Sequence, residues 1–249
     1  MKIGLFGDSY IDLMWNMYPD HNPTREEKPW SYRLLDDMGS RILTSGKGGS
    51  NQFYAIKTWM EHFDYPFGLC DVAIFTFTWE NRMYSEIDAV RELMHAGAEL
   101  RDYVEGESEF KHTVETAIHN YKTYLQSQEQ QNFLYELMVK WILDLPRQYP
   151  NTKFIFLPNT EFARQTVLRN FKDGVMVNFT FEALSNLETG SPGIMPVNCG
   201  RTGHLRDKNH EAMTSLVKGI IKDYDTIKNT IIDPDFSKFD LIEVPVFKR

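Results

Sequence analysis

The feature that most constrains the fold is a series of short apolar runs, each bounded by a glycine or a polar turn and separated by helical patterns. Continuous apolar runs of this length are typical of strands in a parallel sheet, because both faces of such a sheet are covered. The runs occupy residues 1–6, 41–44, 72–77, 153–157 and 175–179. Strands that alternate with helices predict an α/β fold, with helices on both faces of a doubly wound sheet.

Four segments show the three-to-four residue spacing of an amphipathic helix. They lie at 30–38, 53–60, about 109–145 and 207 to about 228. The third is interrupted by the polar stretch 127–131, which predicts two helices or one bent helix. The last residues, 231–249, hold two prolines and are expected to be irregular or extended. With no repeat or low-complexity linker, we expect one domain over 1–249, with a helical insertion around 97–130.

Composition excludes several function classes. The chain has 249 residues and a formal net charge of −8, with a pI near 5.4. An acidic protein lacks the basic face that binding to nucleic acid demands. No apolar run approaches the ~20 residues of a membrane span, and the N-terminus does not resemble a signal peptide. Two cysteines are too few for a disulfide framework, so a soluble, cytoplasmic protein is expected. No feature indicates an oligomeric state.

Polar, glycine-containing segments follow three of the predicted strands. They are Gly7-Asp8-Ser9-Tyr10, Gly46-Lys47-Gly48-Gly49-Ser50-Asn51 and Thr78-Trp79-Glu80-Asn81-Arg82. Ligands of open α/β sheets bind outside the carboxyl ends of the strands, where these segments are expected to lie. A serine in a tight turn there becomes a nucleophile when a base, usually histidine, lies within hydrogen-bond reach. Taken alone, Ser9 is equally interpretable as a helix N-cap.

Several motifs together resemble those of the SGNH/GDSL hydrolases. Gly7-Asp8-Ser9 resembles block I of that family, and Trp30 with Leu34-Leu35 resembles the Trp-x-x-Leu-Leu helix that follows. Gly46-Lys47-Gly48-Gly49-Ser50 resembles block II, and residues 203–210 resemble the His-Leu-Ser-x-x-Gly-His entry into the last helix. The motifs occur in the family's order over nearly the whole chain. The resemblance implies a flavodoxin-like three-layer α/β/α sandwich with a central, mostly parallel five-stranded sheet.

The same resemblance assigns roles to individual residues. It implies that Ser9 is the nucleophile and that the Gly49 N–H forms part of the oxyanion hole. Block III of the family ends a strand with Gly-x-Asn-Asp, whereas here Asn81 is displaced from that register. Asn81 is therefore a candidate oxyanion donor, and Arg82 an alternative cationic contact to substrate. Asp8, beside the nucleophile, is expected to brace the loops through hydrogen bonds.

Two registers compete for the catalytic base. The family's Asp-x-x-His is matched literally by Asp207-Lys208-Asn209-His210. The surrounding motif instead favours His204, since Leu205 and the helix then fall where the family has them. In that register Arg201 occupies the position of the aspartate, so the site is a Ser–His dyad or borrows another carboxylate. His210 lies in the helical period, on the same stripe as Met213 and Val217.

The implied activity is hydrolysis of O-acyl or acetyl esters of carbohydrates, lipids or small molecules, with no cofactor. No metal is expected either, because the remaining histidines show no ligand spacing. Two alternatives remain open: an acyltransferase on the same scaffold, and a non-catalytic binding or structural protein. The latter resembles phage-encoded members, which would act in the virion or the host cytoplasm. The segment 46–49 lacks the Gly-Lys-Ser/Thr order of a phosphate-binding P-loop.

Overall fold

The centre of the molecule is a six-stranded sheet in the order β2-β1-β3-β4-β5-β6, in which every neighbouring pair is parallel. The computed structural model describes residues 1–8, 10–11, 28–47, 50–63, 70–78, 116, 120, 127–186, 205 and 207–241. The strands are β1 (Lys2–Phe6), β2 (Arg41–Thr44), β3 (Val72–Phe77), β4 (Lys153–Pro158), β5 (Val175–Val177) and β6 (Thr230–Ile232). The predicted α/β fold with a parallel sheet is confirmed.

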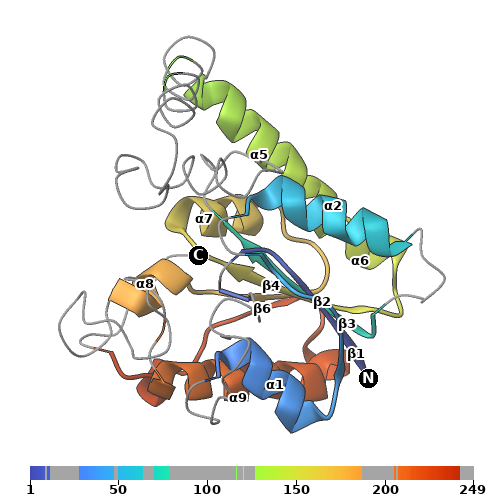
Figure 1. Ribbon diagram of the computed structural model, residues 1–249, viewed down its shortest axis with the longest axis vertical. Helices are drawn as coiled ribbons and strands as arrows, with labels where there is room; N and C mark the ends of the chain where they lie inside the picture. Colours follow the sequence, from blue (N-terminus) through green and yellow to red (C-terminus); the bar gives the residue numbers. More distant parts are fainter. Residues whose placement is uncertain are drawn as a thin grey trace, which may run out of the picture.

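Helices cover both faces of this sheet, giving three layers (Figure 1). One face carries α1 (Trp30–Met38) and α9 (Asp207–Ile227). The other carries α2 (Gln52–Phe63), α5 (Gln128–Leu143), α6 (Leu145–Gln148) and α7 (Glu161–Asn170). The short helix α8 (Phe181–Asn186) follows β5, and a 3₁₀ turn, η3, spans Phe236–Lys238.

The sheet divides the core into two clusters of different character. Alternate residues of each strand point to opposite faces, so in β3 Ile74 joins the α1/α9 cluster and Phe75 joins the α2/α5/α7 cluster. The second cluster is rich in rings that pack edge to face or stacked, such as Phe6 on Phe75 at 4.7 Å between ring centroids. Burial on both faces explains why the strands are continuous apolar runs in the sequence.

Strand β6 is an addition to the five strands predicted from sequence, and it lies at the start of the segment expected to be irregular or extended. Asn229, two residues after α9, is in the left-handed conformation, with φ of 64°. Its backbone N–H donates to the Gly174 carbonyl at 2.6 Å, and its side chain accepts from the Gly174 N–H at 3.1 Å. These two hydrogen bonds place β6 beside β5, where Ile231 pairs with Met176. Residues 242–249 lie outside the described part.

The polar stretch that weakens the helical pattern near residue 130 is the beginning of α5. Ser127 is its N-cap, and the Ser127 hydroxyl accepts from the Gln130 N–H. The buried face is formed by Tyr135, Val139, Ile142 and Leu143. Four apolar residues that belong to the predicted helical pattern are exposed: Phe133, Leu134, Leu137 and Trp141.

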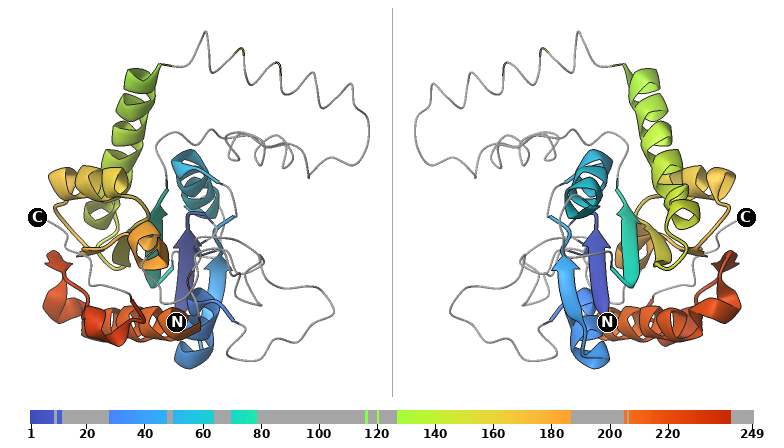
Figure 2. Two further views of the ribbon diagram at one scale, coloured as in Figure 1. Left: turned by 90° about the vertical axis from the view of Figure 1, so that its left-hand side faces the viewer. Right: turned by 90° about the vertical axis from the view of Figure 1, so that its right-hand side faces the viewer.

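The exposure of these residues follows from the position of α5. Figure 2 shows α5 extending beyond the layer that α2 and α7 form against the sheet. Most of the expected insertion, 97–130, lies outside the described residues. Among the described helices, none is both long enough and apolar enough to cross a bilayer.

Candidate functional site

The turn after β1 is built around Gly7, whose φ is +156°. A Cβ at this position would lie 1.9 Å from the Thr76 hydroxyl oxygen, so no side chain fits. The Gly7 carbonyl accepts from the Lys47 N–H at 3.0 Å and from the Ser50 hydroxyl at 2.8 Å. Gly46 packs so closely that a Cβ there would lie 2.6 Å from the Asp8 carbonyl oxygen. The two glycine-containing segments predicted to meet at the carboxyl edge of the sheet therefore do so.

Asp8 is fully buried in this turn, and its carboxylate is held by hydrogen bonds. The Asn159 side-chain NH₂ donates to Oδ2 at 2.7 Å. The Tyr10 N–H donates to Oδ1 at 3.3 Å, and the Thr76 hydroxyl lies 3.5 Å from the same oxygen. These contacts fasten the end of β1 to β3 and to the residue after β4. A buried carboxylate needs such donors, because burial removes its hydration.

On the other side of Ser9, Tyr10 is held as firmly. The Trp30 indole N–H donates to the Tyr10 carbonyl at 2.9 Å, and the Tyr10 ring stacks on Phe181 at 4.6 Å between centroids. Ile11 is fully buried, and its N–H donates back to the Asp8 carbonyl at 3.2 Å. Ser9 itself lies outside the described residues. The residues on both sides of it are anchored to three different elements.

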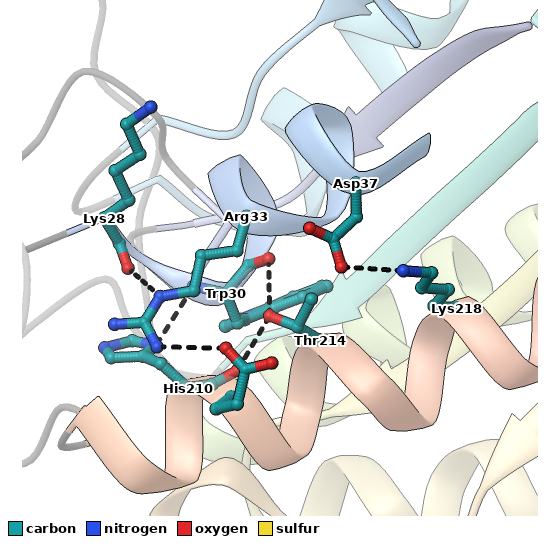
Figure 3. A network of polar contacts seen from close by, with 8 residues as sticks. Lys28, Trp30, Arg33, Asp37, His210, Thr214 and Lys218 are labelled. Atoms are coloured by element: carbon teal, nitrogen blue, oxygen red, sulfur yellow. Dashed lines mark hydrogen bonds and ion pairs between the residues drawn. The ribbon is translucent and has the colours of Figure 1, made fainter. Parts of the chain in front are cut away.

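His210 lies in the first turn of α9, where it caps α1 (Figure 3). Its Nδ1 accepts from the Trp30 N–H at 3.1 Å, so this nitrogen carries no proton. The Thr214 hydroxyl bridges the carbonyls of Trp30 and His210, at 3.1 and 2.8 Å. The residue before α1 is Pro29, which offers no capping side chain. Nδ1 of His210 thus has a structural partner, and the buried stripe predicted for this residue faces α1.

Further ion pairs join the two helices beside this contact. Lys218 and Asp37 are 2.8 Å apart, and Arg33 lies 3.5 Å from the Glu211 carboxylate. The Arg33 Nε–H also donates to the Lys28 carbonyl at 2.7 Å. Helix α9 is therefore fixed to α1 through residues 210–218, and α1 in turn is bound to Tyr10 through Trp30.

Two further described residues belong to the segment predicted to hold the catalytic base. Leu205, next to His204, is buried in the core cluster that contains Ile11, Trp30 and Phe181. Tyr10, which follows Ser9 in the sequence, packs against the same cluster. Asp207 is the first residue of α9. The remaining candidates lie outside the described residues: Ser9, Gly49, Asn81, Arg82 and His204.

Sequence reasoning missed Asn159 and Thr76 as partners of Asp8. Asn159 directly follows β4, as the predicted site segments follow their strands, and that position was the available signal. Asp8 and Asn159 follow β1 and β4, which are not neighbours in the sheet, because β3 lies between them. Their contact therefore depends on the order of the strands. In the part of the chain that the structure describes, no group of three histidine, cysteine, aspartate or glutamate side chains could hold a metal ion.

No protein-family model and no curated protein matches the chain. Among solved structures, the chain is similar to one described as a "putative GDSL-like lipase" from Parabacteroides merdae, with 16% identity and a TM-score of 0.45. The match covers 88% of this chain and 95% of that one. Identity at this level carries no activity from one protein to the other.

Proposed function

We propose that this protein is a serine hydrolase that cleaves the ester bonds of small-molecule or carbohydrate substrates. The observation that carries the proposal is the anchoring of Asp8 and Tyr10. Asp8 is held by Asn159, and Tyr10 by Trp30, at 2.7 and 2.9 Å. A nucleophile needs this kind of preorganised support, because small misplacements of the attacking atom reduce the rate strongly.

In the proposed reaction, His204 takes the proton of the Ser9 hydroxyl as the Ser9 oxygen attacks the ester carbonyl carbon. The backbone N–H groups of Ser9 and Gly49, with the side chain of Asn81, hold the oxyanion of the tetrahedral intermediate. Such donors are each worth about 3–4 kcal/mol of barrier. The C–O bond to the alcohol then breaks, and His204 protonates the leaving oxygen. Water attacks the acyl-enzyme by the same route, which releases the acid and restores Ser9.

His204 is preferred to His210 as the base because Nδ1 of His210 already accepts from the Trp30 N–H. A base in a serine hydrolase uses both ring nitrogens, one toward serine and the other toward a group that orients the ring. Recruiting His210 would remove the cap of α1. Leu205, the residue after His204, is buried in the core cluster that also contains Ile11.

The experiment is fluorophosphonate labelling with intact mass and peptide mapping. We expect one adduct on Ser9 in the wild type, none in Ser9→Ala, and strongly slowed labelling in His204→Ala. His210→Asn keeps an acceptor for the α1 cap and should label at nearly the wild-type rate. Labelling that depends on His210 would restore the Asp207–His210 register. A folded wild-type protein that forms no adduct would refute the serine hydrolase and favour the binding-protein alternative.

A further inference from the structure

Among the residues that the structure describes, two buried polar side chains directly beyond the ends of β3 and β4 each have an atom without a hydrogen-bond partner. They are the Thr78 hydroxyl oxygen and the Asn159 side-chain carbonyl oxygen, in residues that are 1% and 3% exposed. An unsatisfied buried polar atom destabilises a folded protein by about 1–3 kcal/mol. Groups left in this state in a native protein call for an explanation, and binding of a ligand is one.

The two residues are neighbours on adjacent strands. In the parallel pair of β3 and β4, Phe77 lies opposite Pro158, so Thr78 and Asn159 follow directly beyond the last paired positions. The Asn159 backbone N–H donates to the Phe77 carbonyl at 2.9 Å, which holds this arrangement. Thr78 is two residues from Thr76, whose hydroxyl contacts Asp8.

The neighbouring groups fix the chemistry that each free atom offers. The NH₂ of Asn159 donates to the Asp8 side chain at 2.7 Å, so the carbonyl oxygen of Asn159 points elsewhere. That oxygen is therefore an acceptor in need of a donor. The Thr78 hydroxyl can donate or accept, while the Thr78 backbone carbonyl is already bound by the Tyr135 hydroxyl at 2.8 Å.

We propose that Thr78 and Asn159 form a subsite for a hydroxyl group of the ester substrate, an inference that rests on the function proposed above. One hydroxyl serves both residues: it donates to the Asn159 oxygen and accepts from the Thr78 hydroxyl. The subsite lies at the turn that carries Ser9, because Asn159 binds the residue before it. An alkyl group in the same place leaves both protein atoms unsatisfied, so the site selects hydroxylated esters over alkyl esters.

Paired substrates of equal size test this selectivity. In the acyl series, 4-nitrophenyl glycolate is compared with 4-nitrophenyl propionate, which replaces the hydroxyl by a methyl group. In the alcohol series, 1-monoacetylglycerol is compared with 2-methylbutyl acetate, which replaces both hydroxyls by methyl groups. The measured quantity is the ratio of the two kcat/KM values in wild type and in Thr78→Val, so that intrinsic differences in substrate reactivity cancel. We expect the ratio to fall roughly tenfold in Thr78→Val in at least one series, and that series identifies the part of the substrate that carries the hydroxyl.

Thr152→Val is the matched control. Thr152 is also buried and precedes β4 at the opposite end of the strand, where its hydroxyl donates to the Cys70 carbonyl at 2.9 Å. Its ratio should equal that of the wild type. An unchanged ratio in Thr78→Val in both series overturns the subsite while leaving the esterase intact, and indicates that ordered water occupies the two atoms. Absence of both turnover and a fluorophosphonate adduct in the folded wild type overturns the subsite together with the hydrolase.

Discussion

Two threonines of the same strand end should respond in opposite ways to the same substitution. Thr76 and Thr78 are both buried. The Thr76 hydroxyl contacts the Asp8 carboxylate and backbone N–H at 3.5 and 3.4 Å, whereas the Thr78 hydroxyl has no partner in the part of the chain that the structure describes. Replacing threonine by valine exchanges the hydroxyl for a methyl group of similar size. We expect Thr78→Val to raise the free energy of unfolding and Thr76→Val to lower it.

The magnitudes follow from these contacts. Thr78→Val removes an unsatisfied hydroxyl that costs about 1–3 kcal/mol, so a gain of about 1–2 kcal/mol is expected. Thr76→Val removes long contacts to a buried carboxylate, for which a loss of about 1 kcal/mol is reasonable. The two variants should thus differ by about 2–3 kcal/mol. For a chain of this size, that corresponds to a separation of roughly 5–10 °C in Tm.

Urea unfolding followed by circular dichroism measures both free energies, with equal slopes as the check that only stability has changed. If Thr78→Val is destabilised as much as Thr76→Val, the Thr78 hydroxyl has a partner in solution and the reasoning is refuted. If Thr78→Val gains stability and also loses selectivity for hydroxylated esters, the Thr78 hydroxyl binds substrate at a cost to the stability of the free protein.

Further outcomes are expected from three other residues. His210→Ala removes the acceptor for the Trp30 N–H and should lower the free energy of unfolding by about 1–2 kcal/mol, whereas His210→Asn should recover most of it. Tyr135→Phe leaves the buried Thr78 carbonyl without its donor and should lose about 1–2 kcal/mol in urea unfolding. Burial raises the pKa of the Cys70 thiol from 9.0 to about 12, so native protein should resist iodoacetamide at this residue at pH 8 and react there only when unfolded. Rapid alkylation of Cys70 in the native protein would contradict this buried position. Because the pKa of the thiol is raised on folding, the associated stability is complete below about pH 9 and is lost as pH rises toward 12. Unfolding measured as a function of pH would detect this loss.

The sequence is most informative where local pattern and tertiary environment agree. The buried strands of a parallel sheet are mostly apolar, so β1, β3 and β4 are recognisable from their residues alone. Strand β6 is only three residues long and follows closely after a helix. Its pairing with β5 depends on the contact between Asn229 and Gly174, which are far apart in the sequence. No local pattern contains that information.

The candidate site shows the same division. Its position beyond the strand ends follows from the topology of α/β folds, and Gly7 and Gly46 could be singled out because tight turns need them. The role of Asn159 could not be predicted, since it reaches Asp8 past the end of an intervening strand. His210 was expected on a buried stripe, but its contact with α1 depends on the crossing of two helices far apart in sequence.

The late position of β6 in the chain has a consequence for biosynthesis. β5 ends at Val177, but the strand that covers its outer edge begins only at Thr230, after α8 and α9 have been made. At about 5–20 residues per second, a ribosome needs roughly 3–10 s to cross that interval. During this time the nascent chain presents an unpaired strand of three buried apolar residues, which is the kind of edge that joins other chains. A nonsense mutation before codon 230 would leave the edge of β5 permanently unpaired, and its product should accumulate in the insoluble fraction.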